Sequence, residues 1–486
     1  MPIPQEILAV ERPRNTVVTV YGKNKDKYAV KQRKGCKYIN GRRIPINGAT
    51  IGHIIDGKYV PKINFELKQN PLTQASIDLK DWGAFVLADN LAHQLLNELQ
   101  TVYSQNDALK IYCISILRVC RPGIKDYELK DAYDESFLSE LYPGVGLSKN
   151  TVSDFLSSLG KSYSRIVKYM AIRSAAVEAG HHILVDGTLK SNDSKINTLS
   201  DFSRKAREKG TRDISILYAF DLESQEPVCL KCFPGNMPDS VSYRSFIEEN
   251  GIKKGILVGD KGFPSSSVKE VIRDNKELHY MNPLKRDSKY IKRYGLYNFE
   301  GQLPGFENIL YKKVKVENVE KWLYCFRDTQ KAHSEEYSWL HKMQKSGNFE
   351  NEKYKKDSIS FGTIILESDC DMNPLVAYRA YSCRWEIELV MRYYKQACEF
   401  DETRVHTDYS VLGSEFCNFL ASVITYRFLN KFDKAELLQR MNYKRIISIL
   451  NRAKKICLDG NEWHLIQMNP SQIDVLKSLG LTENGN

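Results

Sequence analysis

The sequence lacks several features that define whole classes of protein. No apolar run reaches the roughly 20 residues that a membrane-spanning helix needs, and there is no internal repeat or low-complexity linker. The first residues, MPIPQEILAVERPRN, have no basic start followed by an apolar stretch, so we expect no secretory signal. With 42% hydrophobic and 27% charged residues, the composition is that of a folded protein. We therefore expect a cytoplasmic protein without membrane association, built of roughly two to four domains.

Paired cysteines are also scarce. The eleven cysteines are scattered singly, apart from Cys229-x-x-Cys232, and no second pair follows at the spacing of a zinc site. The pair lies in PVCLKCF, which we interpret as a strand, where residues three apart point to opposite faces. We therefore predict buried thiols in a reducing compartment rather than a metal or redox site.

Acidic residues are few near the N-terminus. The net charge is +11, and residues 1–60 contain 12 Lys plus Arg against 4 Asp plus Glu. Cations mixed with tyrosines and glycines suit a nucleic-acid backbone, although an acidic partner or a plain solvated surface would have the same composition. The candidate DNA contacts in this segment are Lys31, Arg33, Lys34, Arg42 and Arg43.

Changes of hydrophobic period divide the chain. Residues 1–75 alternate and carry the hairpin signals Asn40-Gly41, Asn47-Gly48 and Asp56-Gly57, which predict a basic antiparallel β module. Residues 76–178 have the helical period. From residue 179 onward, apolar segments such as HHILVDGT, ISILYAFD and GILVGD predict the strands of an α/β fold with mixed strand directions.

One helix of the second region has clear end signals. Ser148 is the predicted N-cap and Gly160 the predicted end. This helix is a candidate for the second helix of a helix-turn-helix, with Asn150 and Thr151 exposed at its start as candidate DNA contacts. Any pair of packed helices gives the same pattern, so a purely structural interpretation stays open.

Two aspartates follow apolar segments and precede glycines, in Val185-Asp186-Gly187 and Gly259-Asp260-Lys261. We predict that each ends a strand, because α/β folds bind ligands at the carboxyl ends of strands and a glycine admits a phosphate. A strand-end Asp is also a common turn or N-cap residue.

A predicted helix at about 377–401 carries a polar stripe. At 3.6 residues per turn, Tyr381, Arg384, Glu388 and Lys395 lie within about 60° of one another, and Glu386 lies on the far side. Phosphodiester cleavage uses two Mg²⁺ ions held by carboxylates, with Mn²⁺ as a substitute. Asp186, Asp260 and Glu388 are the candidate metal ligands and catalytic residues, while the other three side chains suit phosphate binding. Ordinary helix ion pairs are the alternative interpretation.

The spacing Tyr-x2-Arg-x3-Glu-x6-Lys resembles the Tyr-Arg-Glu-Lys motif of bacterial insertion-sequence transposases of the insertion-sequence-four type, in the DDE superfamily. The segments ILVDGT, LVGDKGF and PGNMPDS support the resemblance, which covers roughly residues 180–430. It implies a ribonuclease H-like α/β core of residues 179–284 and 376–430, interrupted by a β-rich insertion at 285–375. A helical region, 431–486, would follow. The insertion would stack a flipped base on an aromatic ring, for which Trp322, Trp339 and Trp385 are candidates.

The resemblance also implies a function. A homodimer would bind the inverted-repeat ends of an insertion sequence in double-stranded DNA, cleave them and join them to target DNA, by a cut-and-paste route, at the bacterial nucleoid. Two alternatives remain open at this point: a catalytically silent DNA-binding regulator of transposase descent, and a ribonuclease H-like structure-specific nuclease.

Overall fold

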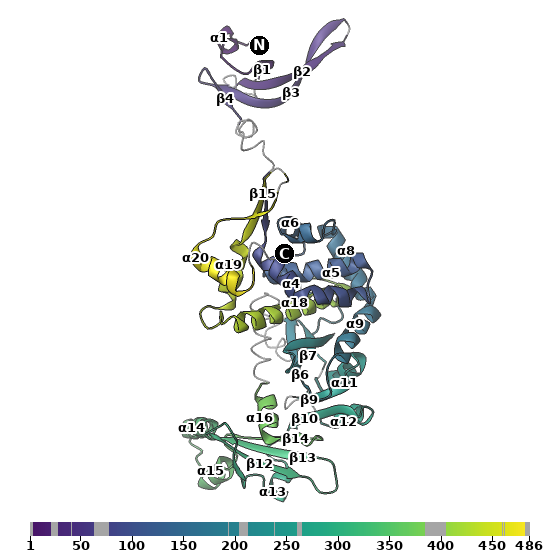
Figure 1. Cartoon of the computed structure of the whole chain (residues 1–486), viewed down its shortest axis with the longest axis vertical. Helices are drawn as coiled ribbons and strands as arrows, with labels where there is room; N and C mark the ends of the chain where they lie inside the picture. The colour runs from purple at the N-terminus through teal and green to yellow at the C-terminus, as the bar shows by residue number, and fades with distance from the viewer. Residues whose placement is uncertain are drawn as a thin grey trace. The chain divides into compact units, whose positions relative to one another are not determined.

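The computed structural model describes residues 3–20, 28–39, 41–62, 77–192, 194–203, 212–237, 239–259, 265–383, 405–458, 460 and 462–481. The chain divides into two compact units, Met1–Leu79 with Lys455–Ile466, and Lys80–Lys454 with Gln467–Asn486 (Figure 1). Among the described residues, no helix combines the length and apolar character needed to cross a membrane.

The first unit contains a four-stranded antiparallel sheet in the order β1-β2-β3-β4. Its strands are β1 (Thr16–Val20), β2 (Tyr28–Ile39), β3 (Arg42–Ile55) and β4 (Lys58–Pro61), preceded by α1 (Gln5–Leu8). A small core of Val18, Val30, Ile51 and Ile54 lies at one end of the long β2–β3 pair. The rest of that pair is a two-stranded ribbon, of residues 31–39 and 42–50, whose β2 positions from Gln32 to Tyr38 are exposed. A three-stranded sheet has the order β16-β15-β5, with β5 (Ile77–Asp81), β15 (Lys454–Leu458) and β16 (His464–Leu465).

The turn signals of this unit were partly right. Asp56 and Gly57 have φ of 51° and 74° and form the turn between β3 and β4, as predicted for an Asp-Gly hairpin. The predicted turn at Asn47-Gly48 is wrong, because both residues lie inside β3, where Asn47 pairs with Arg33. The long ladder with β2 continues through this dipeptide, and the irregular register there accommodates it.

Most of the stretch of residues 76–178 is helical, although it begins with β5. It contains α4 (Gly83–Gln100), α5 (Gln105–Cys120), α6 (Leu129–Asp134), α7 (Leu138–Leu141), α8 (Lys149–Lys161) and α9 (Tyr163–Ala175). Helices α4, α5 and α8 all pack against α18 (Asp408–Lys434), a helix whose residues from Gly413 to Tyr426 are buried. Thus α18 forms the centre of this layer (Figure 1).

The end predicted for α8 is wrong, although its start is correct. The Ser148 side chain accepts a hydrogen bond from the Thr151 backbone N–H, as an N-cap should. The helix, however, continues through Gly160 to Lys161. Gly160 lies against α18: a Cβ there would come within 1.8 Å of the Tyr409 carbonyl oxygen, so the glycine permits close helix packing rather than ending the helix.

A nine-stranded mixed sheet has the order β11-β12-β13-β14-β10-β9-β6-β7-β8. Five of its strands are β6 (His182–Ser191), β7 (Asp213–Asp221), β8 (Glu226–Pro234), β9 (Lys254–Val258) and β10 (Glu277–Pro283). Strands β6, β9 and β10 run parallel, whereas β7 and β8 are antiparallel to their neighbours. Helices α11 (Asp239–Glu249) and α12 (Ser265–Arg273) connect these strands. The expected α/β class with mixed strand directions is confirmed.

Residues 285–375 contribute four strands and three helices. They are α13 (Lys289–Arg293), β11 (Gly301–Gln302), β12 (Ile309–Lys315), β13 (Trp322–Asp328), α14 (Thr329–Ser346), α15 (Asn351–Ser358) and β14 (Thr363–Ser368), followed by α16 (Pro374–Ser382). Strand β14 pairs with β10, so these strands extend the same sheet.

The described part of the C-terminal region contains two helices besides β15 and β16, namely α19 (Tyr443–Arg452) and α20 (Pro470–Ser478). Residues 434–456 do not form one continuous helix. Helix α18 ends at Lys434 and Glu436 has a φ of 56°, so the chain turns before Asn442 caps α19.

Candidate functional site

Asp186 lies in the middle of β6, half-buried, opposite the fully buried Tyr218 of β7. Its Oδ1 accepts a hydrogen bond of 2.9 Å from the Gly187 backbone N–H. The prediction that the strand ends at this residue is wrong, because the antiparallel pairing with β7 continues to Ser191. What does end here is the parallel pairing with β9, whose last partners are Leu184 and Val258.

The candidate site is therefore expected at the edge of the sheet beyond Val258. Three parallel strands, β6, β9 and β10, point their carboxyl ends toward it. Gly259 is held there by a 3.2 Å hydrogen bond from its N–H to the Asn282 side-chain oxygen. The next residue, Asp260, lies outside the described residues.

Helix α16 covers the sheet face on which Leu184 lies. Ala377 and Ala380 belong to one buried cluster with Leu184 and Val258, and the half-buried Tyr381 packs against that cluster. Because side chains alternate along a strand, Asp186 is on the same face as Leu184. Of the predicted stripe, the structure thus places Tyr381 over this face. Arg384, Glu388 and Lys395, like Trp385, lie outside the described residues.

A seam of polar contacts joins the end of β6 to the chain that leads into α18. Lys190 Nζ lies 2.6 Å from Glu415 Oε2, and neither side chain is exposed. Farther along, the Asn192 side chain donates to the Val405 carbonyl at 3.1 Å, and the Ser194 hydroxyl donates to the His406 carbonyl at 2.7 Å. Sequence reasoning missed this seam. The available signal was Lys190 itself, a cation in phase with Asp186 on the same strand.

A second group of titratable residues lies at the opposite end of β6. One ligand atom each from His181, Asp221 and Glu223 lies within 4.8 Å of the others. His181 Nδ1 is 2.8 Å from Asp221 Oδ2, and His182 Nδ1 is 2.7 Å from Glu223 Oε1. About five residues of strand, roughly 16 Å, separate this group from Asp186. It is therefore distinct from the carboxyl edge of the sheet.

Two pKa values in this group are shifted. Burial alone would lower the pKa of His181, but the hydrogen bond and charge of Asp221 outweigh burial and raise it. Burial alone would raise the pKa of Glu223, but its hydrogen bonds with His182 lower it. The contacts thus favour the protonated, charged form of His181 and the deprotonated, charged form of Glu223.

The described tryptophans differ in their surroundings. Trp339 packs with Phe349, Tyr354 and Phe361, and its Nε1 donates a 3.1 Å hydrogen bond to Asp357. Trp322 is half-buried at the start of β13, with Lys315 Nζ 4.9 Å from the centre of its ring. Its position opposite Ser368 and Lys315 places it in the pairing that joins β13 to its neighbours.

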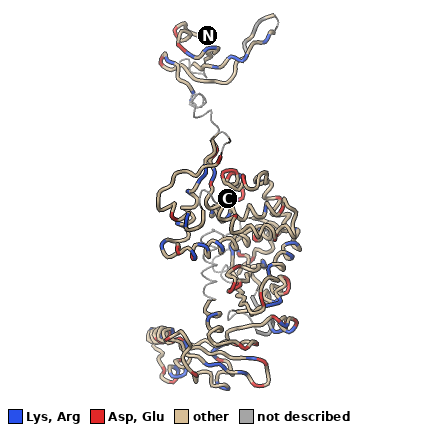
Figure 2. Tube along the Cα trace, viewed as in Figure 1, with Lys and Arg blue, Asp and Glu red and all other residues tan. Residues whose placement is uncertain are grey.

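The predicted DNA contacts of the first unit follow the ribbon of β2 and β3 (Figure 2). Arg33 and Lys34 are exposed and Lys31 is half-buried. Arg42 and Arg43 pair with Ile39 and Tyr38 across the ribbon. The sequence contains no acidic residue between Asp26 and Asp56.

Two other predicted features lie in the second unit. Asn150 is exposed at the start of α8, while the hydroxyl of Thr151 is 2.7 Å from the Ser148 hydroxyl within the cap. Cys229 and Cys232 are both buried in β8, and burial raises the pKa of Cys229 to about 12. A thiol held protonated in this way is a poor metal ligand, because metals bind the thiolate.

Comparison with protein families gives a match within this unit. Residues 180–411 match the family model described as the transposase DDE domain. The comparison with curated proteins gives no match. The match supports a DDE transposase family, and the large mixed sheet is consistent with a ribonuclease H-like DDE domain. This domain implies a transposase that acts on DNA and depends on divalent metal ions.

Proposed function

We propose that the chain is the transposase of a bacterial insertion sequence of the insertion-sequence-four type, with Asp186, Asp260 and Glu388 as its catalytic residues. The observation that carries this proposal is the parallel register of β6 and β9, in which Leu184 pairs with Val258. Asp186 and Asp260 each follow their member of that pair by two residues. If the same register continued past this pair, the two carboxylates would lie side by side, since neighbouring strands are about 4.8 Å apart.

The ends of the segment that contains Glu388 support the third member. The segment follows α16, whose Ala377 and Ala380 share a buried cluster with Leu184 of β6. Where the segment ends, the carbonyl of Val405 accepts a hydrogen bond from the side chain of Asn192, the residue after β6. The returning chain is therefore held by the residues that follow β6, while α16 itself packs on β12 and β13 of the same sheet. If the helix continues past Ser382, Glu388 is about 10 Å farther along its axis than Tyr381, on the same stripe.

These residue types fit the divalent metal that the family implies. The described carboxylate, Asp186, is half-buried at a carboxyl edge, and carboxylate oxygen is the ligand that hard cations prefer. Asp186, Asp260 and Glu388 would hold two Mg²⁺ ions, or Mn²⁺. The ions supply an activated nucleophile and stabilise the leaving oxygen. Arg384 and Lys395 would bind the flanking phosphates, and Tyr381 would donate a hydrogen bond to one.

The first unit is proposed to bind the ends of the element. Its two-stranded ribbon has dimensions that a DNA major groove admits. Arg33 and Asn47 are direct cross-strand partners and therefore share a face. Arg and Asn are also the side chains that pair with guanine and adenine edges, respectively. Lys31, Lys34, Arg42 and Arg43 would neutralise phosphates beside them. Asn150 at the start of α8 is a secondary candidate for a DNA contact.

The remaining steps follow the family implication. A homodimer would hold both inverted repeats, free the 3′-hydroxyls and transfer them to target DNA by cut and paste. Trp322 and Trp385 are proposed to stack a flipped base. Trp339 is the weaker candidate, because its ring already packs against three other aromatic rings.

The test uses the purified full-length chain and duplexes that carry the inverted repeats flanking its gene. We expect cleavage with Mg²⁺ or Mn²⁺ and none with a chelator. Asp186→Asn and Glu388→Gln should abolish cleavage but retain end binding, whereas Glu386→Gln, the matched control on the other side of the helix, should cleave at the wild-type rate. End binding without cleavage by the wild-type protein would instead indicate a silent regulator. Cleavage of branched duplexes without regard to the repeats would indicate a nuclease.

A further inference from the structure

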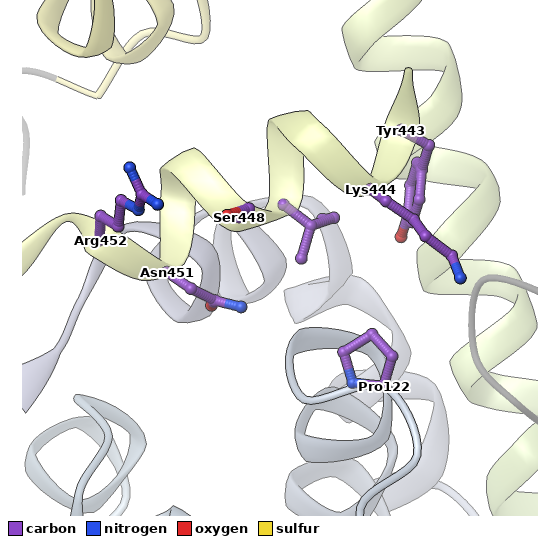
Figure 3. Close-up of a pocket in the computed structure, with 7 residues that line it drawn as sticks. Pro122, Tyr443, Lys444, Ser448, Asn451 and Arg452 are labelled. Atoms are coloured by element: carbon purple, nitrogen blue, oxygen red, sulfur yellow. The ribbon is translucent and has the colours of Figure 1, made fainter. Parts of the chain in front are cut away.

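A pocket of about 440 Å³ lies along α19 in the second unit, and none of the proposed catalytic or DNA-binding residues lines it (Figure 3). It is lined by Pro122, Tyr443, Lys444, Ile447, Ser448, Asn451 and Arg452. Six of these seven residues come from one helix, and Pro122 faces them from the turn after α5. We call this pocket the α19 groove.

The lining of the groove has two kinds of surface. Tyr443 and Ile447 are buried, at 2% and 4% exposure, and with Pro122 they give it an apolar wall and floor. Lys444, Ser448 and Arg452 follow one another at intervals of four residues, so they form a single polar row. A sugar–phosphate backbone presents the same alternation of apolar sugar and anionic phosphate.

The charges around the groove favour a polyanion. The sequence has no acidic residue from Leu437 to Leu458, and six Lys or Arg side chains fall in that stretch. Within the described part of the chain, neither Lys444 nor Arg452 forms an ion pair. The nearby cations Arg121 and Lys454, by contrast, are both paired with Asp81. The two lining cations are thus available to an external anion.

The spacing distinguishes an extended ligand from a single small anion. Lys444 and Arg452 are eight residues apart, about 12 Å along the helix axis. Figure 3 shows them at opposite ends of the groove, with Ser448 between them. One strand of DNA carries a phosphate about every 3.4 Å of axis. A groove of this length therefore matches successive phosphates of one strand.

The position of the groove is fixed rather than adaptable. The Asn451 side chain donates a 2.9 Å hydrogen bond to the Cys120 carbonyl, which ties α19 to the end of α5. Ile446, Ile449 and Leu450 on the inner side of α19 are buried. The backbone of α19, from which the three side chains of the polar row project, is consequently held in one orientation by packing.

We propose that the α19 groove binds the sugar–phosphate backbone of duplex DNA through Lys444, Ser448 and Arg452. The proposal rests on the proposed function in that it takes DNA as the partner. It adds a contact in the second unit that is independent of the carboxylates and of the β2–β3 ribbon. Because it contacts backbone and no base edge, its contribution is the same for any sequence.

The test measures the affinity of the full-length protein for duplex DNA over a series of salt concentrations, with chelator present so that no cleavage occurs. Lys444→Ala/Arg452→Ala should weaken binding to repeat and unrelated duplexes alike. It should also make the slope of log K against log salt shallower by about 2, since each phosphate contact contributes about 0.9. Ser448→Glu, which adds a carboxylate in the middle of the row, should weaken binding as well.

The matched control is Arg440→Ala/Arg445→Ala, which removes the same charge from exposed positions that do not line the groove. An equal change of slope in both double variants would overturn the proposal, because the overall positive charge of the protein would then explain the effect on DNA binding. The proposal would also be overturned if the wild-type protein bound inorganic phosphate tightly while Lys444→Ala/Arg452→Ala left the affinity for DNA unchanged. Failure of the wild-type protein to cleave with Mg²⁺ would refute the proposed function alone, since this measurement needs no cleavage.

Discussion

Lys190 and Glu415 form a fully buried ion pair, with Nζ and Oε2 2.6 Å apart and no exposure of either side chain. The pair connects β6, which carries Asp186, to α18, the helix at the centre of the second unit. Glu415 also accepts a 3.1 Å hydrogen bond from the Asn418 side chain, and Arg118 donates to Asn418 in turn at 2.7 Å. The contact therefore belongs to a network that reaches α5.

Removal of one member of this pair should be severely destabilising. Lys190→Met leaves Glu415 buried without its cation, and such losses cost about 3–5 kcal/mol. We expect the free energy of unfolding, measured by urea denaturation, to fall by that amount. Replacement of both, as Lys190→Met/Glu415→Leu, should recover much of the loss, because two apolar side chains need no charge partner. Losses of the Lys190→Met and Glu415→Leu single variants that simply add in the double variant would show that the two charges do not interact.

The packing of α8 on α18 makes a second prediction. A Cβ on Gly160 would be 1.8 Å from the Tyr409 carbonyl oxygen, and one on Gly413 would be 2.1 Å from the Leu156 carbonyl oxygen. Gly160→Ala should therefore lower the stability to unfolding by about 1–3 kcal/mol, although alanine favours helices intrinsically. Gly180→Ala, where nothing lies within 4 Å of the added carbon, is the control and should be nearly neutral.

A third prediction concerns pH and the group at the start of β6. The pKa of His181 is raised in the folded protein by Asp221, so its contribution to stability is present below the unfolded pKa of about 6.5 and is lost as pH rises through the folded pKa. His181→Gln should accordingly reduce the free energy of unfolding more at about pH 5.5 than at about pH 8. In an Asp221→Asn background the same substitution should show a smaller difference, because only the more distant charges of Glu223 and Glu178 then raise the pKa of His181; a chemical denaturation series at several pH values can check this.

The ribbon of the first unit gives a fourth prediction. Lys31→Ala/Arg33→Ala should weaken binding to the inverted repeats and make the slope of log K against log salt shallower by about 2. Lys58→Ala/Lys62→Ala removes the same charge from exposed positions in that unit but outside the ribbon. A gel-shift series in which both double variants lose affinity equally would contradict a contact by the ribbon itself.

Much of the framework was predictable because it depends on local signals. Strands β6, β7, β8 and β9 follow from short apolar runs, and the Ser148 cap follows from residue type alone. Where the prediction was wrong, a tertiary contact decided the outcome. Asn47-Gly48 has the composition of a turn but is retained in β3 by its long partner strand. Gly160 has the composition of a helix end but lies under the backbone of α18.

The sequence allowed the residue types of the site and their order along the chain to be predicted. It did not show which residues lie opposite each other in the sheet. The pattern Val-Asp-Gly marked Asp186, yet only the register of β6 with β9 shows that Leu184 and Val258 are level. The seam at Lys190 and Glu415 joins residues 225 positions apart, and such pairs cannot be identified from one sequence. The α19 groove likewise depends on Pro122, which is more than 300 residues from the helix it faces.

The pairing of β14 with β10 has a consequence for any attempt to shorten this protein. Met281 pairs with Ser368 and Pro283 with Leu366, so residues 285–375 are not an appendage that can be cut away at its two attachment points. A minimal version without them would leave β10 as a bare edge strand, a surface prone to join other chains. Trimming for crystallisation or delivery should therefore keep β14, or else redesign β10 with a charged or proline-containing edge.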